Sequence, residues 1–288
     1  MRNHYVPEFL LRGWSESTPD GRVEVFRFDL DRLRSDRHAR RYTGFENDLY
    51  ALTEPEVAGM EKHAVEKYFL RRVDNEAALV HTKLVEHGLK DLTLAERSAW
   101  VRFLVSLPVR QPNIVLELRR EAADHLRNRL RSNPEEFEAL SGDEIVPTPE
   151  EWTERQFPGL IENFGMSFFH ELVDNPDVGN RILRTKWWLW DFSGTGRELV
   201  LADVPLILTT GIDDPNLIIA LPITFDKAFM TTSSEQAATA LRSHDARSLA
   251  ERINQSSVMQ ARVRVYARNK KPLRFIQNRL HRRSSINV

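Results

Sequence analysis

The spacing of apolar residues changes along this chain, and that change limits the folds that it can adopt. Between residues 66 and 84 the apolar positions recur at intervals of three and four, which is the period of a helix with one buried face. After Asn175-Pro176 the apolar residues instead form short runs separated by Gly, Pro and Asp, a pattern typical of antiparallel strands. A chain that carries the two patterns in separate segments is expected to be an α+β protein.

The predicted order is a mainly helical N-terminal two-thirds with a small N-terminal sheet, followed by an antiparallel sheet and C-terminal helices. The small sheet uses Val23 to Phe28 and a second strand within residues 42–52. The predicted helices cover residues 55–87, a stretch that begins at Thr93 and is interrupted by Pro108 and Pro112, and residues 114–131, 150–173, 234–241 and 246–267. The predicted strands of the second sheet cover residues 186–192, 198–201, 206–210, 217–221 and 228–232.

These elements are expected to form a single compact domain over residues 1–268. The segment 132–149, rich in Glu and Pro, is the best candidate for an internal boundary. Residues 269–288 are expected to be a flexible basic tail. The run from Arg32 to Arg41 is offset by nearby aspartates and is expected to be a solvated loop.

The composition excludes several classes of protein. The 288 residues contain no cysteine, which excludes a disulfide framework and a thiol nucleophile and fits a reducing compartment. The N-terminal residues lack the apolar region of a secretion signal, and no later stretch has the length of a membrane span. We therefore expect a cytoplasmic protein that has no membrane partner.

The C-terminus carries the clearest anomaly of charge. The formal net charge of the chain is only −1, so an anionic partner must be met by a local patch. Residues 261–288 contain nine Lys or Arg and no Asp or Glu. The candidate nucleic-acid-binding residues in this segment are Lys270, Lys271, Arg274, Arg279, Arg282 and Arg283. The alternative is that these side chains are merely solvated.

Four polar residues in structural segments are candidates for catalysis. His4 titrates near neutral pH and is suited to act as a base or a ligand, or it hydrogen-bonds inward and fixes the N-terminal strand. Glu66 lies on the apolar stripe of its helix, where a carboxylate needs a counter-charge or a metal. Arg110, between two prolines, is a candidate anchor for a carboxylate or phosphate, or a clamp between helices that pairs with Glu66. Asp203 follows a predicted strand, and its alternative role is to cap a turn.

A metal site is one way to use these residues. If the fold brings His4, Glu66 and Asp203 together, they would hold a divalent ion such as Mg²⁺ or Mn²⁺ that activates water for phosphodiester hydrolysis. His63, Asp74 and His81 also project from a flank of the first long helix, but without the His-Glu-x-x-His spacing that makes a metal prediction strong.

The order of several short motifs resembles a bacterial family catalogued as domain of unknown function 4238. Residues 3–14 read Asn-His-Tyr-Val-Pro-Glu-Phe-Leu-Leu-Arg-Gly-Trp, which resembles the N-terminal signature of the family. Shorter similarities follow at residues 65–67, 73–74, 110–112, 221–224 and 254, and residues 202–205 match a Ser-Asp-Asn-Pro motif at the Asp and the Pro. The resemblance extends from residue 3 to about residue 268. The family has no assigned activity, so the resemblance implies no function.

The leading hypothesis is a nucleic-acid-associated protein, and more specifically a metal-dependent nuclease or phosphodiesterase with His4, Glu66 and Asp203 around the ion. The first alternative is a non-catalytic module that binds another protein. The second alternative is an enzyme that acts on a small anionic substrate bound by Arg110.

Overall fold

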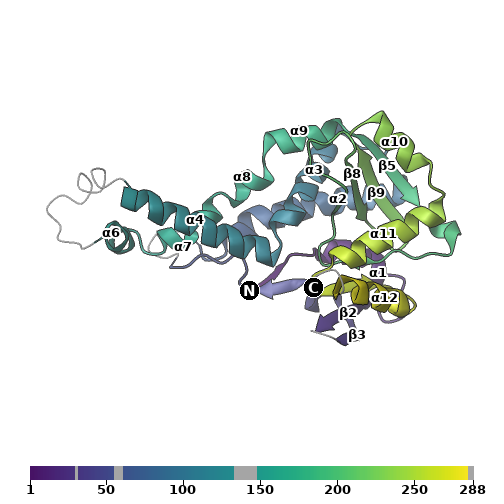
Figure 1. Cartoon of the computed structure of the whole chain (residues 1–288), viewed down its shortest axis with the longest axis horizontal. Coiled ribbons are helices and arrows are strands. Elements are labelled where there is room, and N and C mark those ends of the chain that lie inside the picture. The colour runs from purple at the N-terminus through teal and green to yellow at the C-terminus, as the bar shows by residue number, and fades with distance from the viewer. Residues whose placement is uncertain (30–31, 55–60, 133–147, 285–288) are drawn as a thin grey trace. The chain divides into compact units, whose positions relative to one another are not determined.

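The computed structural model describes residues 1–29, 32–54, 61–132 and 148–284 (Figure 1). Its contacts divide the chain into two compact units. Unit 1 comprises Met1–Asn3, Glu46–Arg72 and Val109–Asp174, and unit 2 comprises His4–Phe45, Val73–Pro108 and Asn175–Val288. Most of the expected boundary at 132–149 lies outside the described residues.

Helices and strands are both abundant, which confirms the α+β class. The strands are β1 (Arg2–His4), β2 (Val23–Asp29), β3 (Arg32–His38), β4 (Phe45–Asn47), β5 (Lys186–Asp191), β6 (Leu201–Ala202), β7 (Ile207–Leu208), β8 (Ile218–Pro222), β9 (Lys227–Thr232) and β10 (Arg264–Ala267). The α-helices are α1 (Glu8–Ser15), α2 (Arg71–His87), α3 (Leu94–Val109), α4 (Pro112–Ser132), α6 (Pro149–Gln156), α7 (Leu160–Ser167), α8 (Phe169–Val173), α9 (Pro176–Arg184), α10 (Glu235–Arg242), α11 (Ala246–Gln260) and α12 (Leu273–Ser284). Short helical turns are η1 (Arg40–Tyr42), η2 (Val65–Leu70), which is π-helical, and η3 (Ser193–Thr195).

Several predicted helices have the expected ends. Thr93 and Glu96 form a capping box at the start of α3, in which the Thr93 backbone N–H donates to Glu96 at 2.9 Å and the Glu96 N–H donates to Thr93 Oγ1 at 3.3 Å. α2 ends before Gly88, whose φ of +77° is a left-handed conformation that glycine adopts at little cost. Residues 55–60, where the first long helix was expected to begin, lie outside the described residues.

Unit 1 is mainly helical, and its core is formed by Tyr50, Leu70 and Phe169 together with apolar residues of α4 and α7. The stretch 150–173 was expected to be one helix and is three, α6, α7 and α8. α6 ends at Gln156, and Gly159 then takes a φ of +76° at the start of α7. A Cβ at Gly159 would lie 2.6 Å from the Thr53 carbonyl oxygen, so the close approach requires glycine there.

Unit 2 contains a four-stranded antiparallel sheet in the order β5-β9-β8-β7. Met230 and Trp188 lie on the face that α10 and α11 cover (Figure 1). The opposite face carries Trp187 and Phe229, and Trp100 of α3 packs edge-on against Phe229 with a centroid distance of 5.7 Å. The tryptophans of β5 are therefore divided between the two faces, since Trp190 packs with the same cluster as Trp188.

A second four-stranded sheet of unit 2 has the order β3-β2-β10-β6 and corrects two predictions. The expected solvated loop after Arg32 is strand β3, which pairs with β2 along its whole length. Its polar side chains conceal the strand because β3 lies at the edge of the sheet, where charges are tolerated. Residues 264–267, expected to end a helix, are strand β10. β10 pairs with β2 on one side and with β6 on the other.

The register of this sheet aligns three arginines. Arg264 of β10 lies opposite Arg27 of β2, and Arg27 lies opposite Arg34 of β3. Directly opposed residues of antiparallel strands project from the same face, so three guanidinium groups share one row. The row is a second cationic feature of unit 2 besides its C-terminal segment.

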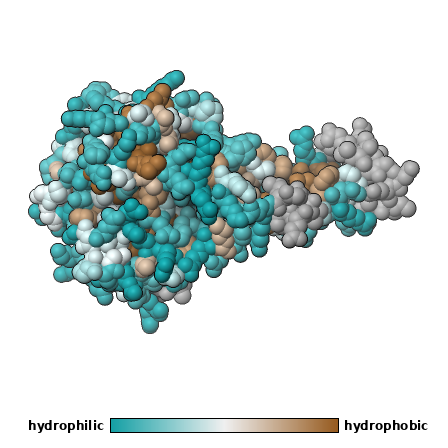
Figure 2. Space-filling view, turned by 180° about the vertical axis from the view of Figure 1, so that it is seen from behind, coloured by the Kyte–Doolittle hydropathy of each residue, from teal (hydrophilic) through white to brown (hydrophobic). Residues whose placement is uncertain are grey.

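The surface is mainly hydrophilic on the face drawn in Figure 2, with smaller apolar patches between the polar side chains. The larger apolar side chains are mostly buried in the clusters described above. Within the described ranges, no helix combines the length and the apolar character needed to cross a lipid bilayer.

Candidate anion-binding site

The N-terminal signature is an anchor that holds α1 inside unit 2. Tyr5 is buried, and its hydroxyl accepts a hydrogen bond from the guanidinium of Arg264. The Val6 N–H donates to the Gly44 carbonyl at 3.0 Å, and Pro7 then precedes the first turn of α1. Gly13 lies so close to the chain at Thr224 that a Cβ would be 2.7 Å from the Thr224 Cα atom. The signature therefore serves packing.

Residues 198–200 are fixed by two polar side chains that come from distant parts of unit 2. The Trp14 indole N–H donates to the Leu199 carbonyl at 2.8 Å. The Asn254 amide accepts from the Val200 N–H at 2.8 Å and donates to the Glu198 carbonyl at 2.9 Å. Because these bonds satisfy buried main-chain groups, they hold a segment with little secondary structure of its own in one position.

Asp203 closes this arrangement from the other end. Its carboxylate accepts the backbone N–H groups of residues 262, 263 and 264 at 2.7, 2.7 and 2.9 Å, so it shapes the turn between α11 and β10. The side chain is 2% exposed. Burial raises the pKa of Asp203, and the three backbone donors act in the opposite direction. These contacts are those of a turn cap, the alternative that the sequence left open.

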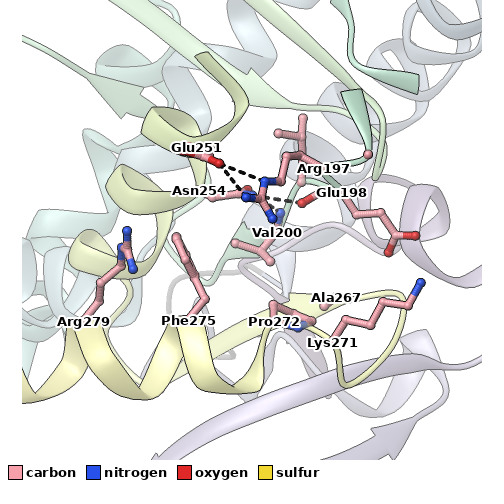
Figure 3. Close-up of a pocket in the computed structure, with 12 residues that line it drawn as sticks. Arg197, Glu198, Val200, Glu251, Asn254, Ala267, Lys271, Pro272, Phe275 and Arg279 are labelled. Carbon is pink, nitrogen blue, oxygen red and sulfur yellow. Dashed lines mark hydrogen bonds and ion pairs between the residues drawn. The ribbon is translucent and has the colours of Figure 1, made fainter. Parts of the chain in front are cut away.

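A cavity of about 440 Å³ opens beside the fixed segment. Its lining residues come from residues 196–200, from α11 and from the C-terminal segment, namely Gly196, Arg197, Glu198, Leu199, Val200, Glu251, Asn254, Ala267, Lys271, Pro272, Phe275 and Arg279. Figure 3 shows Phe275 and Arg279 projecting from α12 on the side opposite Glu251 and Arg197. The guanidinium of Arg279 stacks on the Phe275 ring at 3.6 Å.

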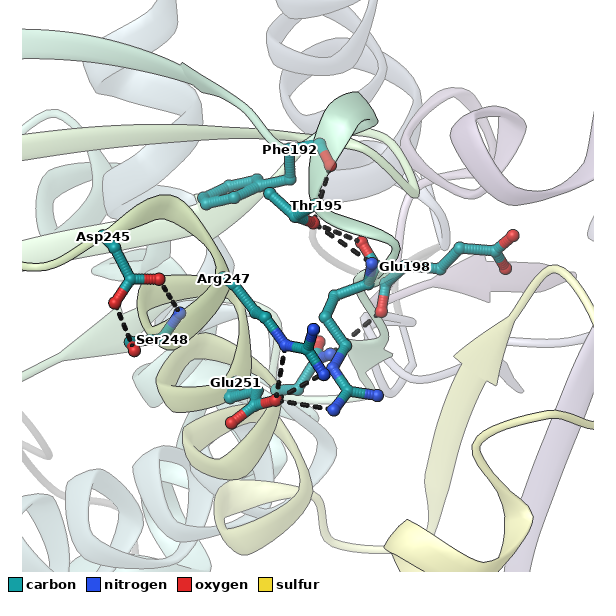
Figure 4. A network of polar contacts seen from close by, with 9 residues as sticks. Phe192, Thr195, Glu198, Asp245, Arg247, Ser248 and Glu251 are labelled. Carbon is teal, nitrogen blue, oxygen red and sulfur yellow. Dashed lines mark hydrogen bonds and ion pairs between the residues drawn. The ribbon is translucent and has the colours of Figure 1, made fainter.

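The acidic side chains of the cavity are both paired. Glu251 accepts from Arg197 at 2.8 Å and lies 3.7 Å from Arg247, one turn earlier on α11 (Figure 4). Glu198 pairs with Arg268 and accepts from the Asn269 amide at 2.9 Å. The lining carries three cations, Arg197, Lys271 and Arg279, against these two carboxylates, so its formal charge is positive.

Lys271 and Arg279 line the cavity from the C-terminal segment. Within the described part of the chain, the Lys271 ammonium forms no ion pair, and its side chain is exposed. Lys271 and Pro272 immediately precede the first turn of α12, where the helix dipole also favours negative charge. The arrangement is suited to bind an anion that carries a flat group, because an aromatic ring and a guanidinium plane lie next to the charges.

The expected flexible tail is folded as far as Ser284. Residues 273–284 form α12, and Ile276 is completely buried beside Val258 and Val265. Arginines are as frequent as apolar residues in this stretch, which concealed the helix. Of the predicted nucleic-acid-binding residues, Lys270, Lys271 and Arg274 are exposed and Arg279 is half-buried. The side chains of Arg282 and Arg283 lie outside those that the structure describes.

The four predicted catalytic residues are divided between the units. His4 and Asp203 belong to unit 2, and Glu66 and Arg110 to unit 1. His4 lies 3.6 Å from Glu8 and packs on the Phe45 ring at a centroid distance of 5.5 Å. The Asn3 amide donates to Glu66 at 3.1 Å.

Arg110 follows the last residue of α3 in the chain and is fully buried, and the Tyr50 hydroxyl donates to its carbonyl at 2.9 Å. Of the two histidines on the flank of the first long helix, His63 lies 3.9 Å from Asp48 and His81 bonds the Ile223 carbonyl at 2.8 Å. Across residues 1–29, 32–54, 61–132 and 148–284, no three His, Asp or Glu side chains are grouped so that they would hold a metal ion.

The sequence did not single out Arg197 or Glu251. Both lie within ordinary polar surroundings, and they meet only because residues 196–200 are fixed beside α11. Asn254 was noticed through the family resemblance alone. The residues around Asn254 in the sequence do not indicate that its side-chain amide forms hydrogen bonds with the backbone of residues 198–200, as a neighbouring strand would.

Fold and cavity define a class of α+β protein with helix-covered antiparallel sheets and a cationic cavity beside a C-terminal helix. The family model described as "Protein of unknown function (DUF4238)" matches residues 2–271, so the chain belongs to that family and the resemblance found in the sequence is confirmed. Neither the curated proteins nor the solved structures gave a significant match.

Proposed function

We propose that this protein binds single-stranded nucleic acid at the cationic cavity, with one nucleotide in the cavity and the adjoining phosphates on the exposed side chains before and in α12. The observation that carries the proposal is the combination of Phe275, Arg279 and Lys271 in one cavity. Proteins that bind single strands combine a cationic groove with aromatic surfaces on which bases stack.

The size and the charges of the site support this class of ligand. About 440 Å³ is within the range of roughly 300–1,000 Å³ that small-molecule sites occupy, so one nucleotide has room. Lys270 and Arg274 are exposed on either side of Lys271 and Pro272, where they would meet neighbouring phosphates. The lack of cysteine fits a cytoplasmic location, which is part of the proposal.

The proposal concerns binding and not hydrolysis. Asp203, one of the three residues predicted around an ion, uses its carboxylate to hold three backbone N–H groups. Glu66 accepts from the Asn3 amide, and His4 packs on Phe45. Each of these three residues therefore makes a contact that gives it a structural role.

The test is a titration of labelled oligothymidylate and oligouridylate, followed by fluorescence anisotropy at several salt concentrations. Lys271→Gln should weaken binding and reduce the slope of log K against log salt by about 0.7, the effect of one phosphate contact on a single strand. Phe275→Leu keeps the apolar packing of α12 and should lose about 1–3 kcal/mol of stacking per base.

Lys90→Gln is the matched control, because Lys90 is an exposed lysine of the same unit that does not line the cavity. It should bind like the native protein. Absence of binding at low salt, or equal binding by the native protein, Lys271→Gln and Phe275→Leu, would rule the proposal out.

A further inference from the structure

A second cavity, of about 200 Å³, lies in unit 2 between one face of the β5-β9-β8-β7 sheet and the helices α10 and α11. Its walls are apolar and are formed by Ile207, Ile218, Ala220, Met230, Leu241 and Ile253. Ala220 on β8 and Ala240 on α10 also line it, and their short side chains leave the space between sheet and helices. The cavity is separate from the cationic site, which lies against the other flank of α11 at Glu251 and Asn254.

The polar residues of this cavity are few and include no acid. Thr209, His244, Arg252 and Ser256 complete its lining. Arg252 is exposed, and among the described residues it forms no ion pair. An exposed guanidinium beside an apolar cavity without a carboxylate favours a ligand that has a negative head and an apolar body.

We propose that this cavity binds a small carboxylic acid with a short apolar chain, with the chain between the sheet and the helices and the carboxylate on Arg252. A single guanidinium balances one negative charge, and its planar fork matches a carboxylate in two hydrogen bonds. A dry apolar cavity of about 150 Å³ is known to hold a molecule of the size of benzene. The present cavity is somewhat larger and accepts a chain of medium length.

The experiment is isothermal titration of the full chain with octanoate, with 1-octanol and octylamine as probes that keep the chain and change the head. We expect octanoate to bind more tightly than 1-octanol and octylamine not to bind. Arg252→Gln should weaken octanoate binding by about tenfold, the change that corresponds to one charge-assisted hydrogen bond, and should leave 1-octanol unchanged.

Ala240→Phe places a large side chain in the cavity from an exposed helix position, so it should abolish octanoate binding without loss of fold. Thr239→Phe is the matched control on the same helix and should bind octanoate normally, since Thr239 does not line the cavity. Circular dichroism confirms that each variant is folded. The proposal is overturned if octanoate does not bind, if octylamine binds equally well, or if Ala240→Phe binds as Thr239→Phe does.

Discussion

At the scale of single residues, several buried polar side chains of unit 2 form hydrogen bonds with backbone groups. Trp14, Asn254 and Asp203 each reach a backbone group more than fifty positions away in the sequence. A buried polar group is costly without a partner, so these bonds fix the relative positions of segments that have few ladder bonds of their own. Such residues resemble catalytic ones in a sequence, because both are polar residues in apolar surroundings.

His81 gives a prediction at this scale that concerns pH. Burial lowers the pKa of His81 below its usual value of about 6.5, and its Nε2 contacts the Ile223 carbonyl at 2.8 Å. The unfolded chain therefore binds the proton first as the pH falls below about 6.5, and the free energy of unfolding declines from there toward the lowered pKa of the folded protein. The decline is at most about 1.4 kcal/mol per pH unit for one group.

The measurement compares the denaturant midpoints of the native protein and His81→Gln from about pH 7.5 to about pH 5.5, the range in which histidine titrates. Glutamine keeps a donor for the Ile223 carbonyl and has no charge to gain. The variant should lose less stability than the native protein as the pH falls. Identical pH dependence in the two proteins would contradict the assignment.

The sequence was sufficient to single out four polar residues in structural segments, namely His4, Glu66, Arg110 and Asp203. It did not identify their partners, since a hydrogen bond between Asp203 and residue 262 depends on how the whole sheet is built. Spacing along one helix predicts neighbours three and four residues away, and it carries no information on contacts between distant segments.

At the scale of elements, local signals were reliable where they were strong. The capping box at Thr93, the glycine after α2 and the strands β5, β7, β8 and β9 lie where the sequence indicated. The strand predicted at 198–201 is an exception, because β6 covers Leu201–Ala202 and pairs with β10 in the other sheet. β3 was missed because its charged side chains hide the alternation of apolar residues. β10 was missed because it follows α11 closely, so that the helical period seemed to continue to Ala267.

Asp203→Asn tests the turn that begins β10. An asparagine presents one oxygen in place of two and turns an N–H group toward backbone donors, so the variant should lose roughly 1–3 kcal/mol of unfolding free energy. Asp36→Asn, an exposed change on β3, is the control and should have little effect. Urea denaturation of both variants measures the difference, and equal midpoints would show that Asp203 does not hold this turn.

At the scale of the whole molecule, the positive charge is local and the net charge is −1. The proposed site has four cations that take no part in the ion pairs of Glu198 and Glu251 and whose side chains the structure describes. They are Lys270, Lys271, Arg274 and Arg279. Four phosphate contacts on a single strand predict a slope of about −3 for log K against log salt, which is roughly a 60-fold loss of affinity between about 50 mM and 200 mM salt.

The anisotropy titrations described above measure this slope. A value near zero would mean that the cations do not contact phosphates. A much steeper slope would mean that further cations contact phosphates. The next residues to substitute would then be the row of Arg264, Arg27 and Arg34.

The division into two units has a practical result for anyone who wants to study them apart. The polypeptide passes from one unit to the other after residues 3, 45, 72, 108 and 174, so each unit is assembled from three separate stretches of chain. Trimming either end cannot isolate one unit, because every fragment long enough to complete unit 1 also carries residues 4–45 and 73–108 of unit 2. Separate expression would instead need the three stretches of a unit to be joined by new linkers.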